Sequence, residues 1–274
     1  MDKSDNSRLL EISPHDPHVA QFVEKYQFYR FDSESWIKTV PNARLECWQI
    51  FAGGFTIWDQ DQKCFFPAPT FGGYPSTNTS MLFHIPEELY CINIKFYLRA
   101  LSLPFLRKLY PPDPTQDIEK YIQEYTSHRL NLHSIYLHGK LKTNELDHWI
   151  KGILKSYQPD QMVDAILAKI GSANIQTVKQ LADALNQSPR NLQRIVRLKF
   201  NMSPKELLSI HRFSQTTSHL KMNLDRYFIE ALSFGYYDQS HFIRECKRLT
   251  GVSPKELFAN MRLSTPDLMI LKSK

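Results

Sequence analysis

The sequence predicts an α+β protein in which a β-rich, sandwich-like or barrel-like domain precedes an all-helical domain. Three observations support this. Strand patterns and aromatic residues dominate the first 110 positions, helical periodicity dominates from about residue 143, and one helical pattern occurs twice, about fifty residues apart. The 274 residues are enough for two hydrophobic cores. We expect a β-rich domain at 1–142, a helical bridge at 143–158, a helical domain at 159–264 and a C-terminal tail at 265–274.

Basic charge is concentrated in the C-terminal part of the chain. Residues 156–274 contain 17 Lys and Arg against 10 Asp and Glu, whereas residues 1–155 contain 17 against 18. Such an excess is typical of a surface that meets phosphate groups, and it also occurs on an ordinary solvated face. Charge alone therefore permits a nucleic-acid partner without requiring one.

The cysteines and the N-terminal residues indicate the expected environment of the protein. Cys47, Cys64, Cys91 and Cys246 are far apart and form no CxxC pair, so they signal neither a disulfide framework nor a zinc site. The first ten residues lack an apolar signal core, and no run approaches the roughly 18 apolar residues that span a bilayer. We expect a cytoplasmic protein with no membrane partner, no metal and no other cofactor.

Strand signals in the N-terminal half group into two predicted hairpins. The predicted pairs are residues 44–52 with 55–59, around Gly53 and Gly54, and residues 81–85 with 90–98, around Pro86. Two successive glycines suit a tight turn with positive φ. From Tyr90 to Tyr97 the residues alternate with a period of two, so we expect one buried face on that strand.

Aromatic side chains occupy 20 of the first 110 positions. A small β-sandwich or barrel of this composition holds either a plain Phe-rich core or an aromatic-lined pocket for a small-molecule effector. The ten histidines are scattered and lack the spacing of a metal-binding barrel. We find no GxSxG motif and no sequence-paired Cys and His, and we expect no enzymatic activity. An enzyme and a ligand-free dimerisation scaffold stay open as alternatives for this half.

Residues 143–170 predict two helices that are separated near Pro159. Apolar residues on the first helix recur with i, i+3, i+4, i+7 spacing: Leu146, Trp149, Ile150, Ile153 and Leu154. This stripe fits either packing within the chain or a homodimer surface.

Residues 177–200 have the pattern of two short helices joined by a tight turn, which is a helix-turn-helix. Ser188 suits the N-cap of the second helix, Pro189 its first position and Asn201 the left-handed residue that ends it. At 100° per residue, the polar arc of this helix, about 188–200, carries Arg190, Gln193, Arg194 and Arg197. Arg can bond guanine, Gln can bond adenine, and a further Arg can neutralise phosphate.

The same pattern recurs fifty residues later. NMSPKELL at 201–208 corresponds to GVSPKELF at 251–258. In the second copy Asp238 is the expected N-cap of a helix at about 238–250, with Gln239 and His241 at its entrance and Ser240, Arg244 and Lys247 on its exposed face. Tyr227 to Phe234 would supply the supporting helix. One long helix, Lys205 to Met222, is expected to hold the two units about 34 Å apart, one turn of DNA.

Two segments resemble the AraC/XylS family of bacterial transcription regulators: GYYDQSHFIRECKRLTGVSPKELF (235–258) and ALNQSPRNLQRIVRLKFNMSPKELL (184–208). The resemblance covers roughly residues 160–262. It implies two helix-turn-helix units, each with a recognition helix in a major groove of double-stranded DNA. By position, the implied base contacts are Arg190, Gln193, Arg194, Gln239, Ser240, His241 and Arg244, and the implied phosphate contacts are Arg197, Lys247 and Arg248. Asn186 and Gln187 replace the family's usual Gly and apolar residue, so the first turn is expected to be less regular.

The resemblance also implies a function. A sequence-specific DNA-binding transcription regulator would recruit or block RNA polymerase, more commonly as an activator. Its N-terminal domain would regulate it through effector binding or through homodimerisation, in the cytoplasm at the nucleoid.

Overall fold

The computed structural model describes residues 7–60, 62–76, 80–103, 106, 119–123, 130–131, 135–137, 140–172, 175–220, 231–262 and 265–271. Most of the helix expected at 227–234 lies outside these residues. Among the described residues, no helix is long and apolar enough to cross a membrane. The same residues contain no group of three His, Cys, Asp or Glu side chains that is suited to hold a metal ion.

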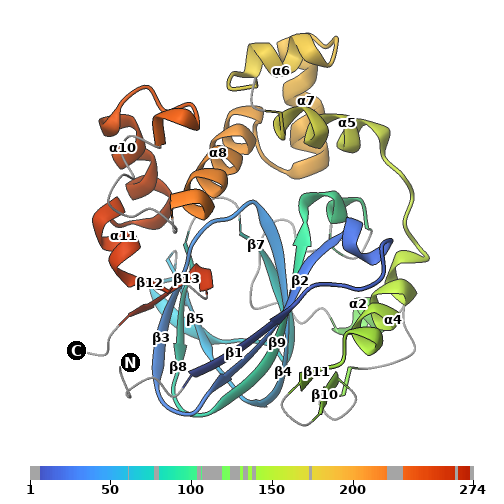
Figure 1. The fold of residues 1–274 in the computed structure, drawn as a ribbon, viewed down its shortest axis with the longest axis vertical. Coiled ribbons are helices and arrows are strands. Elements are labelled where there is room, and N and C mark those ends of the chain that lie inside the picture. Colours follow the sequence, from blue (N-terminus) through green and yellow to red (C-terminus); the bar gives the residue numbers. More distant parts are fainter. Residues whose placement is uncertain are drawn as a thin grey trace.

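Two antiparallel sheets form the N-terminal part of the molecule, as the predicted fold class requires (Figure 1). In spatial order, the first sheet contains β1 (Ser7–Ile12), β2 (Val23–Phe31), β9 (Leu89–Tyr97), β4 (Arg44–Gly53) and β7 (Phe71–Ser76). The second sheet contains β12 (Met261–Arg262), β13 (Thr265–Leu271), β3 (Ser35–Thr39), β8 (Leu82–Ile85), β5 (Thr56–Asp59) and β6 (Cys64–Pro67). A separate ribbon pairs β10 (Tyr136–Leu137) with β11 (Lys140–Leu141).

Both predicted hairpins are wrong. Strand β4 pairs with β7 and β9, whereas β5 pairs with β6 and β8, so Gly53 and Gly54 form a corner between the sheets. Gly53 has a φ of 73°, and a Cβ there would lie 1.8 Å from the carbonyl oxygen of Glu88. Pro86 likewise lies between β8 of the second sheet and β9 of the first. A corner and a hairpin turn need the same residues, so local pattern does not distinguish them.

Both faces of strand β9 are covered, whereas the alternation predicts a single buried face. Ile92, Ile94 and Phe96 belong to the larger core cluster, which joins the first sheet to the helices. On the other face, Cys91 and Asn93 point into the space between the two sheets. The strand therefore carries a polar side chain into the interior.

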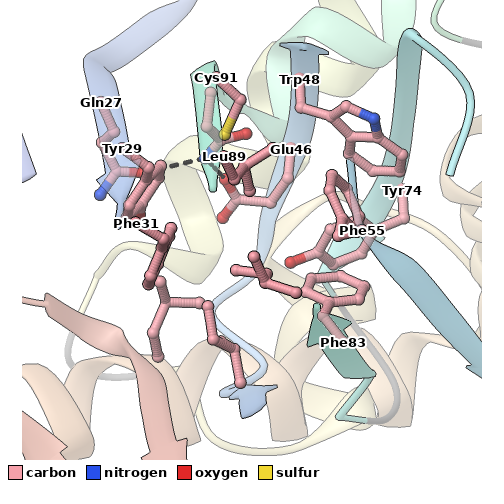
Figure 2. Close-up of a pocket in the computed structure, with 14 residues that line it drawn as sticks. Gln27, Tyr29, Phe31, Glu46, Trp48, Phe55, Tyr74, Phe83, Leu89 and Cys91 are labelled. Carbon is pink, nitrogen blue, oxygen red and sulfur yellow. Dashed lines mark hydrogen bonds between the residues drawn. The ribbon is translucent and has the colours of Figure 1, made fainter. Parts of the chain in front are cut away.

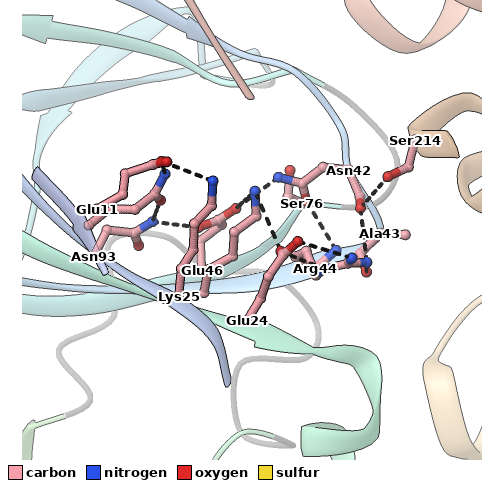
Figure 3. A network of polar contacts seen from close by, with 12 residues as sticks. Glu11, Glu24, Lys25, Asn42, Ala43, Arg44, Glu46, Ser76, Asn93 and Ser214 are labelled. Carbon is pink, nitrogen blue, oxygen red and sulfur yellow. Dashed lines mark hydrogen bonds and ion pairs between the residues drawn. The ribbon is translucent and has the colours of Figure 1, made fainter. Parts of the chain in front are cut away.

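Polar side chains fill part of that interior (Figure 3). Asn42 and Asn93 donate hydrogen bonds to the Glu46 carboxylate at 2.9 and 2.5 Å. The Lys95 ammonium lies 4.0 Å from Glu46, and Arg44 pairs with a further carboxylate on β2 at 2.8 Å. Buried charges need this compensation, because an unpaired one costs several kcal/mol, on the order of 3–5.

Helices α4 (Thr143–Leu154) and α5 (Gln161–Ile170) are the two helices predicted on either side of Pro159. The apolar stripe of α4 is buried within this chain, where Trp149 contacts the Phe71 ring of β7 at 6.0 Å between centroids. The Tyr26 hydroxyl donates to Asp147 of α4 at 2.7 Å. The stripe is therefore an internal packing surface and not a dimer surface. A short helix, α2 (Glu119–Gln123), precedes this region.

The described helices of the C-terminal part include α6 (Val178–Ala184), α7 (Pro189–Phe200), α8 (Pro204–Leu220), α10 (Gln239–Thr250) and α11 (Pro254–Asn260). Helix α8 crosses above one end of the two sheets, with α7 and α10 on opposite sides of it (Figure 1). The Ser214 hydroxyl of α8 donates to the carbonyl oxygen of Asn42 at 2.8 Å (Figure 3). The connecting helix is thus attached directly to the β-rich part.

Residues 265–271, which we placed in a C-terminal tail, form β13. This strand pairs antiparallel with β3, so that Leu268 lies opposite Thr39 and Leu271 opposite Trp36. Close by, the backbone N–H of Ser80 donates to the carbonyl oxygen at the end of α10 at 3.1 Å. The second sheet therefore contains strands from both ends of the chain.

Candidate nucleic-acid interface

The first helix-turn-helix unit consists of α6 and α7. Thr177 and Gln180 form a reciprocal capping box at the start of α6, with N–H···O distances of 3.2 and 3.0 Å. In the turn, Asn186 has a φ of 53° and matches the left-handed conformation of Gly235 (φ 89°) in the second unit. Asn tolerates this conformation better than most residues, so the turn keeps this feature without glycine.

Helix α7 begins and ends where the sequence predicts. The Ser188 hydroxyl accepts the backbone N–H of Asn191 at 3.2 Å, Pro189 opens the helix, and Asn201 ends it with a φ of 52°. Leu192, Val196 and Phe200 are buried against the neighbouring helices. The polar arc of Arg190, Gln193, Arg194 and Arg197 is exposed along the opposite face.

One exposed side chain on α7 is oriented by its neighbours. Arg194 Nη2 donates to Asn191 Oδ1 at 3.0 Å, and Asn191 Nδ2 donates to Gln187 Oε1 at 2.5 Å. This chain of bonds aligns the guanidinium before any partner arrives. We did not single out Asn191 from sequence, although its i, i+3 spacing to Arg194 was the available signal.

The second unit ends in α10, which repeats the geometry of α7. Asp238 accepts the backbone N–H of His241 at 2.6 Å, and Gly251 ends the helix with a φ of 75°. The buried residues are Phe242, Cys246 and Leu249. The exposed polar residues are Gln239, Ser240, Arg244, Lys247 and Arg248.

Two positions on the outer side of α10 are less exposed than the others: the predicted base contact His241, and Ile243. His241 is half-buried between the rings of Tyr236 and Tyr237, at centroid distances of 5.1 and 6.0 Å, and its Nδ1 accepts the Tyr237 N–H at 3.4 Å. Ile243 is also half-buried, at the border of the exposed face. Tyr237 is 89% exposed, which makes it a candidate contact that sequence reasoning missed.

A buried ion pair anchors α10 to α8. Arg212 Nη2 donates to Glu245 Oε1 at 2.9 Å, and the Ser209 hydroxyl donates to the same oxygen at 2.5 Å. Burial opposes ionisation of Glu245, but these hydrogen bonds outweigh it and hold the pKa of the carboxyl below its usual value. Arg248 Nη2 donates to Ser209 Oγ at 2.8 Å, so the guanidinium of this predicted phosphate contact belongs to the same network.

A basic groove of about 640 Å³ separates the two units. Its walls include Lys205, Arg244 and Arg248, which can attract phosphate, together with Glu206 and the ion-paired Arg212 and Glu245. We did not predict Lys205, although it lies in the repeated SPKEL segment. The units touch on one side of this groove, where a Cβ on Gly235 would lie 2.9 Å from the Gln176 side chain.

Comparison with known proteins gives a match to one family model, matches to solved structures, and one negative result. A family model described as a helix-turn-helix domain matches residues 181–260. No curated protein sequence matches the chain. A solved structure of ToxT from Vibrio cholerae, 12% identical, covers 85% of this chain and 97% of its own, with a TM-score of 0.52. ToxT bound to (E)-4-(8-methylnaphthalen-1-yl)but-3-enoic acid, 14% identical, covers 85% and 98% with a TM-score of 0.51.

At this identity the ToxT likeness establishes the fold, in which a β-rich part precedes a helical part with a helix-turn-helix. The family match covers both capped units, from the core of α6 to the end of α11. Residues 181–260 are therefore an AraC-type helix-turn-helix domain, and the protein is a DNA-binding transcription regulator.

Proposed function

We propose that α7 and α10 read successive major grooves on one side of double-stranded DNA. Base edges would be met by Arg190, Gln193, Arg194, Gln239, Ser240, His241 and Arg244. Phosphates would be met by Arg197, Lys247 and Arg248. The observation that carries this proposal is the presence of two equally capped helices, each with an exposed face that contains no acidic residue. Arg is the side chain best suited to bidentate guanine recognition.

The groove between the units supports a common docking surface. Arg244 and Arg248 contribute to it from α10 and Lys205 from α8, so a phosphate backbone that passes between the units would meet cations from two helices. The Arg212–Glu245 pair holds α10 on α8, which limits changes in the spacing of the two readers.

We assign the regulatory role to residues 1–142 together with strand β13. Six aromatic side chains surround a cavity between the sheets: Tyr29, Phe31, Trp48, Phe55, Tyr74 and Phe83 (Figure 2). Aromatic cavities suit small-molecule effectors, and ToxT has been solved with an aromatic acid bound. We further propose a cytoplasmic regulator without catalytic activity that acts on RNA polymerase, with homodimerisation through a surface other than the buried stripe of α4.

Selection of bound sequences from random double-stranded DNA tests the reading helices. We expect the wild-type protein to enrich a site with two half-sites about one DNA turn apart, roughly 34 Å. The Arg194→Ala/Arg244→Ala variant is expected to lose enrichment in both halves. Lys63→Ala changes an exposed cation of the β-rich part and is the matched control. Undiminished, equally selective binding by the double variant would refute the assignment.

A further inference from the structure

The cavity between the sheets is small for the ligands that its walls suit. Its volume is about 70 Å³, and apart from one polar end it is lined by aromatic and aliphatic side chains (Figure 2). A cavity that takes up benzene has a volume of about 150 Å³. An aromatic ring that is fully enclosed between the sheets therefore requires one wall of the cavity to move.

The polar end of the cavity selects against anions. It consists of Gln27, Glu46 and Asn93, and none of the described lining residues is Lys, Arg or His. Asn93 donates to Gln27 Oε1 at 2.9 Å and to Glu46 Oε2 at 2.5 Å. A ligand carboxylate would lie beside the Glu46 carboxylate, whereas Lys95, 4.0 Å from Glu46, does not line the cavity. Like charges repel strongly at low dielectric. An uncharged aromatic molecule with a hydroxyl or similar group avoids that cost.

One wall of the cavity comes from the far end of the chain. Leu268 of β13 lines the cavity and packs with the smaller core cluster, whose members include Phe31 and Ile37. Its neighbour Met269 is fully buried in the larger cluster, which also contains Leu257 of α11. Successive residues of β13 therefore face the cavity and the helical core in turn.

Strand β13 is attached to the strands of the β-rich part on one side only. Within the second sheet it pairs with β3 on one side and with the two-residue strand β12 on the other. The first-sheet strands β2, β4 and β9 line the cavity and pair over eight or nine residues, and β8 and β5 each pair on both sides. Expansion of the cavity at Leu268 disturbs four residue pairs with β3, Leu268 to Leu271.

We propose that an uncharged aromatic ligand in this cavity displaces Leu268, and that ligand occupancy and pairing of β13 with β3 exclude one another. Because β13 follows α11 in the chain, its release frees the second helix-turn-helix unit from the edge of the second sheet. This inference rests on the regulatory role proposed for the β-rich part. It adds the ligand class and the residue through which occupancy reaches the DNA-binding part.

The test uses the full chain, with benzyl alcohol as the uncharged probe and benzoate as its carboxylate counterpart. Leu268→Ala removes the obstructing side chain, and Leu271→Ala shortens a β13 residue that packs with the larger cluster and does not line the cavity. Probe binding is followed by calorimetry, and amide hydrogen exchange reports the pairing of β13 with β3.

We expect Leu268→Ala to bind benzyl alcohol about tenfold more tightly than wild type, because binding to this variant does not require displacement of β13. Leu271→Ala should not show this tenfold gain in affinity for benzyl alcohol. Each of the three proteins should bind benzoate more weakly than it binds benzyl alcohol. Benzyl alcohol should accelerate exchange in β13 and β3 of the wild type and leave it unchanged in Leu268→Ala.

Equal affinity of wild type and Leu268→Ala, unchanged or slower exchange in wild-type β13, or benzoate binding as tight as benzyl alcohol would each overturn the inference. Sequence-selective DNA binding by the ligand-free wild type is measured in parallel. Its loss would count against the proposed function, whereas intact DNA binding with a negative probe result would count against this inference alone.

Discussion

Arg212 and Glu245 form a bifurcated ion pair between α8 and α10, in which Nη2 lies 2.9 Å from Oε1 and 3.3 Å from Oε2. Arg212 also lies over the Tyr236 ring at 4.9 Å. The second recognition helix is therefore attached to the connecting helix by charge as well as by apolar packing.

Removal of the carboxylate should destabilise the helical part. Glu245→Ala leaves Arg212 without its acidic partner, and we expect a loss of about 3 kcal/mol in the free energy of unfolding, measured by urea denaturation. Asp183→Ala removes an exposed acid on α6 and should change it by less than about 0.5 kcal/mol. Similar losses of unfolding free energy in the two variants would show that the ion pair does not stabilise the helical part.

The corner between the sheets should tolerate a methyl group at one glycine only. Gly53→Ala places Cβ against the Glu88 carbonyl in a left-handed conformation, and we expect a loss of roughly 3 kcal/mol or more. A Cβ added to Gly54 would meet no atom within 4 Å, so Gly54→Ala should cost less than about 0.5 kcal/mol. Thermal unfolding of the two variants, compared with wild type, gives the measurement. A tolerated Gly53→Ala would contradict the described corner.

Lys247 should contribute to DNA affinity without contributing to sequence selectivity. Its exposed ammonium is placed for phosphate contact, so Lys247→Ala should weaken binding to cognate and non-cognate DNA equally. The slope of log affinity against log salt concentration should fall by about one. Arg244→Ala should instead cost about 1–3 kcal/mol at the cognate site and relax selectivity there. Fluorescence anisotropy with cognate and non-cognate DNA over a series of salt concentrations distinguishes the two effects. If Lys247→Ala lost cognate binding preferentially, Lys247 would contact a base edge and not a phosphate.

Mild acid should weaken the protein through His211 of α8. Burial, together with the nearby Arg44 cation, lowers the pKa of His211 from 6.5 to about 4. The unfolded chain therefore binds a proton near pH 6.5 that the folded chain takes up only near pH 4, so stability is full above pH 6.5 and falls between these values. Urea midpoints should drop across this window in wild type and drop less in His211→Gln. An equal drop in both would exclude His211 as the cause.

Local sequence signals were sufficient to predict where the two recognition helices begin and end. Ser188, Pro189, Asn201, Asp238 and Gly251 all hold the capping or helix-ending positions that the sequence predicts, because a cap depends on residues within one turn. The exposed arc of α7 followed from the helical period in the same way. The choice of base-contacting and phosphate-contacting residues on those arcs stays a prediction.

Long-range pairing was not predictable from local pattern. The strand period identified β4, β5, β8 and β9 but not their partners, since alternation is the same in a hairpin and across a corner. Strand β13 was missed because its partner β3 lies more than two hundred residues earlier in the chain. Glu245 was missed for a related reason: its partners Ser209 and Arg212 belong to another helix.

The position of β13 also determines the order in which the protein can be assembled on the ribosome. Strand β3 is synthesised early, yet its neighbour in the second sheet follows both helix-turn-helix units. Until then β3 presents an unpaired edge, and such edges are sites of aggregation. Completion of the β-rich part therefore waits for synthesis of the entire DNA-binding part, and a nascent chain that has emerged only as far as α11 keeps that edge open.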